Sequence, residues 1–271
     1  MPELPEVETA VRGIQPHLLK QQIVDVTVRQ PQLRWPVPAN LAEQLRGQTV
    51  EQIFRRGKYI IFGTERGHQL LHLGMSGTVR VLPDSTPAAK HDHVDWRFSN
   101  GLLLRLNDPR RFGSVLWTNN DPLAHKLIAS LGPEPLGEGF TEDYLFTQSR
   151  GRKANVKSFI MDSKTVVGVG NIYASESLFL AGIHPKRQAG KISAARYATL
   201  TSAIKTTLAK AIEAGGTTLK DFTSADGKPG YFKQQLHVYG RGGEACTHCG
   251  EPIQQAVLNQ RMTYWCKRCQ R

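Results

Sequence analysis

The chain has 271 residues, 39% of them hydrophobic, which is enough for two domains and a small appendage around a buried core. Its formal net charge of +12, from 35 basic and 23 acidic residues, favours a polyanionic partner, although charge alone does not separate DNA from RNA or from an anionic membrane surface. No apolar run approaches the roughly 18–20 residues that span a bilayer, and no secretory signal is evident, so we expect a cytoplasmic protein with no membrane partner.

The first half of the chain carries a short helix followed by strands. Val7, Val11 and Ile14 share one face of a helix that we predict over residues 2–14. After Pro16 the pattern changes to short apolar runs that are separated by Gly, Pro, Asn or Asp. The predicted strands cover residues 23–28, 50–54, 59–62, 69–73, 78–82, 94–98, 102–106 and 114–117.

The spacing of these strands indicates how they are connected. The Asn100-Gly101 pair is a strong signal for a tight hairpin between two of them. About eight short strands with turn residues between them are typical of an antiparallel sandwich or barrel. We therefore predict such a β domain over roughly residues 20–120.

Helical patterns dominate after a Gly- and Pro-rich segment at residues 132–137. We predict one helix over residues 171–181, ended by Gly182, and a longer helix that Ser193 caps. Residues 217–232 are rich in Gly, Thr, Ser and Lys, which predicts a mobile loop. The apolar face of the longer helix consists of Leu200, Ile204, Leu208 and Ile212.

All four cysteines lie near the end of the sequence, in two C-x2-C pairs that are 16 residues apart. This spacing is typical of four-thiolate zinc, because each pair can supply two corners of a tetrahedron. Four sulfur ligands leave no open position for water, so we predict one structural zinc ion per chain; a redox-active dithiol pair is the alternative. Arg261 lies between the pairs, where a basic hairpin suits DNA. The predicted ligands are Cys246, Cys249, Cys266 and Cys269.

Proline at the second position can act as a nucleophile once the initiator methionine is removed. Pro2 then carries a secondary amine with a pKa of roughly 8, so a useful fraction is neutral at pH 7. A neutral amine attacks an aldehyde-like sugar carbon and forms an iminium. Glu3 and Glu6 lie beside it and can supply a proton and electrostatic support. Acidic residues in a first turn also simply favour the helix dipole, so the residues alone leave both readings open.

Ordered motifs run along the chain from P-E-L-P-E-V-E-T at its start to the four-cysteine segment at its end. Between them lie G-K-Y-I around Lys58, H-L-G-M-S-G around Met75, K-H-D-H-V-D around His91, D-P-R-R-F-G around Arg110, V-V-G-V-G-N-I-Y-A-S-E around Asn171, G-G-T-T-L-K-D-F at 215–222 and D-G-K-P-G-Y-F at 226–232. In this order the motifs resemble those of the bacterial formamidopyrimidine-DNA glycosylases, and the resemblance covers the whole chain.

The resemblance implies roles for the residues around the predicted nucleophile. Pro2 would form the Schiff base at the sugar C1′, and Glu3 would donate a proton in that step. Lys58 would assist β-elimination, and Arg261 would assist δ-elimination. For Glu6 the expected electrostatic support rests on its position alone, three residues after Glu3. These roles imply an enzyme that cuts the DNA strand at the site from which it has removed the damaged base.

The resemblance also implies contacts with double-stranded DNA that contains oxidised purines or abasic sites. His91, Arg110 and Arg152 match positions that contact the DNA backbone. The family usually has Lys at the last of these, and Arg keeps the charge but contacts phosphate through a planar fork. Lys157 and Asn171 match phosphate-binding positions of a helix–two-turn–helix element.

Extruding a base from a duplex leaves a gap that the protein must fill. The resemblance implies an intercalating wedge formed by Met75, Arg110 and Phe112. It further implies that the loop from Thr217 to about Tyr231 closes over the extruded base.

The implied activity is base excision repair by a bifunctional enzyme that removes 8-oxoguanine and formamidopyrimidines, with cytosine preferred opposite 8-oxoguanine, and nicks the strand by β,δ-elimination. One alternative is the related endonuclease VIII branch, which prefers oxidised pyrimidines and usually has Gly where this chain has Leu4. An alternative of another class is a non-catalytic zinc-finger DNA-binding protein. For His93 we predict only a structural hydrogen bond.

We therefore expect an α+β multidomain protein that acts as a monomer in the bacterial cytoplasm, associated with the nucleoid through DNA. Residues 1-131 would form an N-terminal catalytic β-sandwich domain with its helix, and residues 132-150 a linker or hinge. Residues 151-236 would form the helix–two-turn–helix DNA-binding domain with the lesion-binding loop. Residues 237-271 would form the zinc finger with its β-hairpin.

Overall fold

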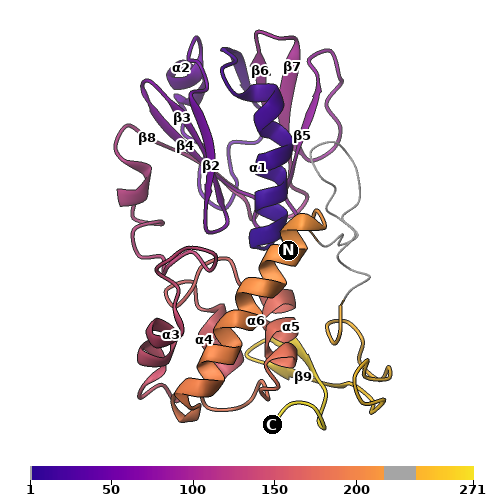
Figure 1. The fold of residues 1–271 in the computed structure, drawn as a ribbon. Helices are drawn as coiled ribbons and strands as arrows, with labels where there is room; N and C mark the ends of the chain where they lie inside the picture. The colour runs from indigo at the N-terminus through magenta and orange to yellow at the C-terminus, as the bar shows by residue number, and fades with distance from the viewer. Residues whose placement is uncertain (1, 217–235) are drawn as a thin grey trace. The chain divides into compact units, whose positions relative to one another are not determined.

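The computed structural model describes residues 2–216 and 236–271 (Figure 1). The described residues form two compact units, one of residues 2–130 with 214–216 and one of residues 131–213 with 236–271. Residues 217–235 lie outside the described residues, and with them most of the loop that the sequence predicts as mobile. The domain bounds predicted from the sequence, 1-131, 132-150, 151-236 and 237-271, stay predictions.

Helix α1 (Leu4–Leu18) begins the first unit. The backbone N–H of Glu3 donates to Glu6 Oε2 at 2.9 Å, which satisfies one of the donors that a helix start leaves without an intrahelical partner. The helix is longer than the predicted 2–14 because it continues through Pro16. In the last turn a proline costs only one backbone hydrogen bond, and Leu18 is fully buried there.

The eight predicted strands are confirmed, each within a few residues of its expected bounds. Among the described residues they form two four-stranded antiparallel sheets, which agrees with the predicted α+β fold with a β-sandwich domain. One sheet has the order β1 (Ile23–Val28), β6 (Asp92–Phe98), β7 (Leu102–Asn107), β5 (Thr78–Pro83), and the other has the order β2 (Gln52–Arg56), β3 (Tyr59–Thr64), β4 (Gly67–His72), β8 (Ser114–Thr118).

The predicted hairpin at Asn100-Gly101 connects β6 to β7. Gly101 has a φ of +78°, a conformation in which a side chain would be strained, and its N–H donates to Phe98 O at 3.2 Å. Asn100 Oδ1 accepts a hydrogen bond from Leu102 N at 3.2 Å. The short turn holds the register in which Trp96 pairs with Leu104.

One apolar core in this unit joins α1 to both sheets. Short helix α2 (Leu41–Leu45), which the sequence analysis did not predict, contributes two fully buried leucines to it. The 3-10 turn η1 (Pro122–Ala124) follows β8. The predicted apolar face of α1 is buried in this core through Val7, Val11, Ile14 and Leu18.

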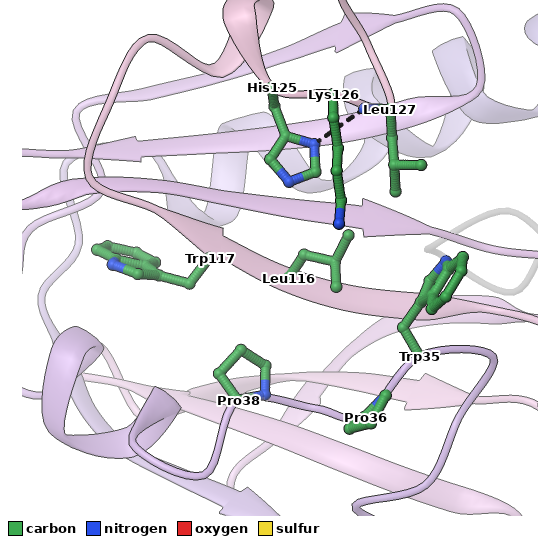
Figure 2. Close-up of a pocket in the computed structure, with 8 residues that line it drawn as sticks. All are labelled: Trp35, Pro36, Pro38, Leu116, Trp117, His125, Lys126 and Leu127. Carbon is green, nitrogen blue, oxygen red and sulfur yellow. Dashed lines mark hydrogen bonds between the residues drawn. The ribbon is translucent and has the colours of Figure 1, made fainter.

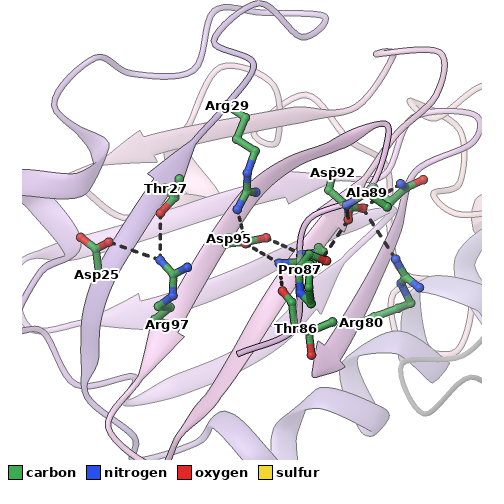
Figure 3. A network of polar contacts seen from close by, with 12 residues as sticks. Asp25, Thr27, Arg29, Arg80, Thr86, Pro87, Ala89, Asp92, Asp95 and Arg97 are labelled. Atoms are coloured by element: carbon green, nitrogen blue, oxygen red, sulfur yellow. Dashed lines mark hydrogen bonds and ion pairs between the residues drawn. The ribbon is translucent and has the colours of Figure 1, made fainter. Parts of the chain in front are cut away.

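A buried ion-pair network ties together the strands of the β1–β6–β7–β5 sheet (Figure 3). Asp95 on β6 has no exposed surface, and its two carboxylate oxygens accept hydrogen bonds from Arg105 Nε and Nη2 at 2.8 and 2.7 Å. Burial opposes ionisation of this carboxyl, but the hydrogen bonds from Arg105 and Arg29 outweigh burial and lower the pKa of Asp95. Arg105 also donates to Thr86 O and Pro87 O, so the network fixes the start of the segment that leads to His91.

The second unit is helical up to its zinc-finger segment. Its helices are α3 (Glu142–Ser149), α4 (Val156–Met161), α5 (Asn171–Leu180) and α6 (Ala194–Glu213), with the 3-10 turn η2 (Ala189–Lys191) before α6. Helices α3 and α5 both contact α6, whose predicted apolar face is buried. Helices α3 and α4 are additions to the prediction, and α3 lies within residues 132-150. No helix in the described ranges is long and apolar enough to cross a membrane.

Candidate functional site

The predicted zinc ligands lie together at the end of the second unit. Their four Sγ atoms are within 4.8 Å of one another, with Cys249 and Cys266 3.4 Å apart and Cys246 and Cys269 3.9 Å apart. Burial opposes ionisation of Cys246, yet the backbone N–H groups of His248 and Cys249 lower the pKa of its thiol to about 7. A closed set of four converging sulfurs fits one tetrahedral zinc ion with no position left for water.

The hairpin of this segment presents Arg261 to solvent. Strand β9 (Gln254–Leu258) and strand β10 (Arg261–Trp265) pair antiparallel. The two residues between them, Asn259 and Gln260, both have positive φ, which matches the twist that two-residue hairpins need. Asn259 Nδ2 also donates to Ser158 Oγ at 2.7 Å, so α4 holds the tip of the hairpin.

Two residues that are predicted to contact phosphate, Lys157 and Asn171, make hydrogen bonds with this hairpin. Lys157 is only 2% exposed, and its Nζ donates to Thr263 Oγ1 at 2.7 Å and to Met262 O at 3.3 Å. Asn171 Nδ2 donates to the same carbonyl at 2.9 Å. Both side chains therefore hold the residue that follows Arg261, and their contact with phosphate stays a prediction. Arg152, which is also predicted to contact DNA, is exposed in the loop after α3.

A small pocket of about 240 Å³ adjoins the hairpin in this unit. It combines the cationic side chains Lys157 and Arg261 with Ser158, Asn259 and Asp162. The lining also includes the apolar side chains of Met161 and Leu258, and the carboxylate of Asp162 would repel an anion.

In the first unit, the predicted nucleophile lies at the start of α1. Pro2 is buried, Glu3 is 1% exposed and Glu6 is fully buried. Gly216, with a φ of +79°, lies against the carboxylate of Glu6, because a Cβ at this position would be 3.3 Å from Oε1. The two predicted carboxylates are therefore held in an enclosed setting at the start of α1.

A chain of contacts connects α1 to the turn that carries Lys58. Arg55 Nε donates to Glu8 Oε2 on α1 at 3.0 Å, and its Nη1 donates to Gly57 O at 3.0 Å. Gly57 has a φ of +58°, which the turn between β2 and β3 requires. Arg55 was not among the predicted site residues, yet it fixes the helix of Pro2 and the turn of Lys58 to each other.

The predicted wedge residues lie on two neighbouring loops of the first unit. Met75 follows β4, and Arg110 and Phe112 lie between β7 and β8. The Arg110 guanidinium stands 4.9 Å from the centre of the Phe112 ring, and Phe112 is 42% exposed. The loops touch through their backbones, because a Cβ at Gly74 would lie 2.3 Å from the carbonyl carbon of Phe112.

The predicted DNA contact His91 has a φ of +72°, an unusual backbone for a residue with a side chain. His93 Nε2 lies 2.8 Å from Asp108 O, which confirms the structural hydrogen bond predicted for this residue. Sequence reasoning missed the buried Asp108, although it opens the D-P-R-R-F-G motif directly after a strand. A buried Asp at a loop start usually accepts backbone N–H groups, and that signal could have found it.

His72, at the end of β4, was also missed. Its Nδ1 accepts a hydrogen bond from Gly74 N at 2.9 Å, so the ring must lack a proton at this atom. Burial, which is the main cause, and the charges of Lys58 and Arg34 together lower the pKa of His72 to about 4. The neutral ring thus holds the start of the Met75 turn.

We expect this histidine to make the protein less stable in mild acid. Between pH 6.5 and about 4 the unfolded chain binds a proton at His72 that the folded chain does not, so the free energy of unfolding falls as the pH falls. The loss from pH 7 to pH 4.5 should be about 2–3 kcal/mol.

Urea unfolding at the two pH values, in wild type and in His72→Gln, measures this contribution. The variant should lose less stability between them than the wild type does. His17→Gln, which changes an exposed histidine on α1, is the matched control. An identical loss in wild type and His72→Gln would contradict the assignment.

A larger pocket of about 390 Å³ lies beside β8 (Figure 2). Its walls are mainly apolar, and His125 Nδ1 accepts a hydrogen bond from Leu127 N at 3.3 Å at one side. None of the predicted catalytic, DNA-binding or metal residues lines it, so it is separate from the candidate site. The lining residues are Trp35, Pro36, Pro38, Leu116, Trp117, His125, Lys126 and Leu127.

The chain combines a two-sheet unit, in which Pro2 and Glu3 are enclosed, with a helical unit that carries a four-cysteine cluster. Three family models match the chain: the formamidopyrimidine-DNA glycosylase N-terminal domain over residues 1–115, its H2TH domain over residues 131–223, and a zinc finger found in FPG and IleRS over residues 243–271. The chain belongs to the formamidopyrimidine-DNA glycosylase family.

The chain is similar to known members of this family over its full length. The formamidopyrimidine-DNA glycosylase of Syntrophotalea carbinolica is 57% identical, with all of both chains covered. Two Lactococcus lactis structures, a mutant FPG with Fapy-dG containing DNA and wild-type FPG with oxidised-pyrimidine DNA, are 33% and 34% identical. Both have a TM-score of 0.92, with 99% of each chain covered. The protein is therefore a DNA glycosylase of base excision repair, from a family with abasic-site lyase activity, and carries one structural zinc ion.

Proposed function

We propose that this protein excises 8-oxoguanine and formamidopyrimidines from double-stranded DNA through a Schiff base at Pro2, and then cuts the strand at the resulting abasic site by β,δ-elimination. The observation that carries the proposal is the enclosed start of α1, where Pro2, Glu3 and Glu6 lie together. The contact from α1 through Arg55 to the Lys58 turn supports it.

In the first step the Pro2 nitrogen, freed by loss of Met1, forms a bond to the sugar C1′ while the bond from C1′ to the damaged base breaks. The base leaves with the proton that the Pro2 nitrogen gives up. Glu3 supplies a proton that lets the sugar ring open, and the product is an iminium. Glu3 is only 1% exposed, which keeps its carboxyl group in an enclosed position beside Pro2. Glu6 holds the backbone of Glu3 in place through the 2.9 Å hydrogen bond.

The iminium then acts as an electron sink that makes the neighbouring sugar protons acidic. Lys58 assists the β-elimination that breaks the bond to the 3′ phosphate, and Arg261 assists the δ-elimination that breaks the bond to the 5′ phosphate. Lys157 and Asn171 donate to the carbonyl of Met262, next to Arg261, which supports the hairpin that carries Arg261. The strand is left with a one-nucleotide gap.

DNA binding rests on the basic residues and on the wedge. Arg152, Lys157 and Asn171 contact phosphates, and the net charge of +12 supplies the electrostatic attraction. His91 contacts the DNA backbone near the lesion. The protein acts as a monomer in the cytoplasm, on damaged or abasic duplex DNA.

Arg110 reads the base opposite the lesion while Phe112 and Met75 hold the gap open. Cytosine without its partner offers acceptors that match the donors of Arg, whereas adenine presents an amino donor. We expect 8-oxoguanine to be excised about tenfold to a hundredfold faster opposite cytosine than opposite adenine, which corresponds to about 1–3 kcal/mol. Arg110→Ala should remove most of this preference.

A panel of duplexes that each carry one defined lesion, in single-turnover reactions, tests substrate and mechanism together. Equal rates opposite cytosine and adenine in the wild type would contradict the role of Arg110. Faster cutting of oxidised pyrimidines than of both purine lesions would support the endonuclease VIII-like alternative, which the binding of oxidised-pyrimidine DNA by the Lactococcus lactis relative makes worth testing. Binding of all duplexes without any cutting would indicate a non-catalytic DNA-binding protein.

A further inference from the structure

Asp108 lies fully buried at the point where β7 ends and the loop of Arg110 and Phe112 begins. A buried carboxylate is costly unless hydrogen bonds satisfy its oxygens. Each oxygen of Asp108 accepts one: Oδ2 from Gly113 N at 2.7 Å, and Oδ1 from Ser76 Oγ at 2.9 Å. The same side chain therefore holds two different loops.

Ser76 connects Asp108 to the backbone of Arg110. Its hydroxyl donates to Asp108 and accepts from Arg110 N at 3.3 Å. The carboxylate thus reaches Gly113 N directly and Arg110 N through one hydroxyl, and these two amides bracket Phe112. Ser76 itself is the residue after Met75.

The backbone of Asp108 fixes a further segment. Its N–H donates to His91 O at 3.0 Å, and its carbonyl oxygen lies 2.8 Å from His93 Nε2. The positive φ of His91 is a conformation that needs such outside support. One buried residue therefore contacts all three segments that carry the DNA-facing side chains predicted in this unit.

We propose that Asp108, with Ser76 as its relay, is a positioning residue that locks the Met75 turn and the Arg110–Phe112 loop into one rigid wedge. The proposal rests on the proposed function, because the wedge matters only if a base is extruded. A wedge on two loops that moved separately would leave the gap partly empty, and extrusion would then lose the contacts that offset the lost stacking. Base excision requires the extruded state, whereas nicking of a preformed abasic site has no base to extrude.

Ser76→Ala is the sharpest test, because it removes the relay and leaves the buried carboxylate and its bond to Gly113. We expect excision of 8-oxoguanine to fall about tenfold to a hundredfold, while nicking of a preformed abasic site stays within about threefold of wild type. Ser76→Thr keeps a hydroxyl and should restore most of the excision rate. Ser99→Ala, in the β6–β7 turn, removes a serine that accepts from Gln22 N, and should change neither rate.

A double-mutant cycle separates positioning from general damage to the fold. If Ser76 acts through the wedge, Ser76→Ala should have little further effect on excision when Phe112→Ala is already present. Equal loss of excision and abasic nicking in Ser76→Ala, or an undiminished effect of Ser76→Ala in the Phe112→Ala background, would overturn the proposal.

Failure of the proposed function can be distinguished from failure of the positioning role. If the proposed function is wrong, the wild type will excise no base. Insertion of the wedge can still be measured by binding to a duplex with a tetrahydrofuran abasic analogue opposite 2-aminopurine. We expect the wild type to change the fluorescence of 2-aminopurine and Ser76→Ala to change it less. The same fluorescence change with both proteins would overturn the positioning role, whatever the catalytic result.

Discussion

An N-terminal extension that keeps Pro2 in an amide bond is expected to lower base excision and strand cutting by at least about a thousandfold, because an amide nitrogen has no available lone pair. The same extension should abolish covalent trapping by borohydride on duplexes with an abasic site. Proteolytic removal of the extension, so that Pro2 becomes the first residue, should restore both. The identical extension placed after Arg271 is the matched control and should change neither.

The size of this effect follows from the chemistry of the amine. A secondary amine with a pKa of roughly 8 is partly neutral at pH 7, whereas a lysine with a pKa of roughly 10.4 is almost fully protonated. Lys58 in its turn beside β3 is therefore a poor substitute for Pro2 as the nucleophile, even though Arg55 links that turn to α1.

Peptide mapping of the trapped adduct shows whether Pro2 or Lys58 is the nucleophile. We expect the DNA fragment on the peptide that begins with Pro2. An adduct on the Lys58 peptide, or undiminished trapping by the blocked protein, would contradict the assignment of Pro2. Loss of excision with trapping intact would instead show that the extension obstructs the damaged base.

Removal of zinc is expected to have the second large effect. Among the described residues, the apolar cluster of this segment has only Phe179, Val238, Ile253 and two of the cysteines as its buried members. So small a core cannot order the segment by itself, and structural zinc contributes about 10–16 kcal/mol in isolated zinc fingers. Cys246→Ser should therefore unfold the hairpin and displace Arg261.

DNA binding and strand cutting should fall together in this variant, by about a hundredfold or more, since the hairpin carries Arg261 and the Met262 carbonyl that accepts from Lys157 and Asn171. The fold of residues 2–130 should persist, because its core shares no residue with the zinc segment. Metal analysis, circular dichroism and binding to an abasic duplex measure the three effects.

His248→Ala is the matched control for zinc loss. His248 lies between the first two ligands, but its ring packs at a tilt of 47° against Phe179, with 4.8 Å between the ring centres, and it is not among the converging metal ligands. The variant should retain one zinc ion per chain. Stoichiometric zinc in Cys246→Ser, or full activity without zinc, would contradict a structural four-cysteine site.

Sequence patterns alone were enough to predict the eight strands, the Asn100-Gly101 hairpin, the apolar faces of α1 and α6, and the zinc ligands. Each of these rests on local regularity: the alternation of apolar residues, the few residues that tolerate positive φ, or the fixed spacing of two C-x2-C pairs. The order of the motifs also predicted the family and the roles expected of Pro2, Glu3 and Lys58.

The short helices and the contacts of Asp108 depend on long-range packing, which local sequence patterns do not reveal. Helices α2, α3 and α4 have 5, 8 and 6 residues, too few for a periodic pattern, and exist because buried residues such as Leu41, Leu145 and Ile160 pack into the cores. Helix α1 runs past Pro16 because Leu18 is buried at its end. Asp108 and Ser76 are 32 residues apart in sequence, so only the pairing of distant strands could bring a carboxylate to the turn of Met75 and the loop of Phe112 at once.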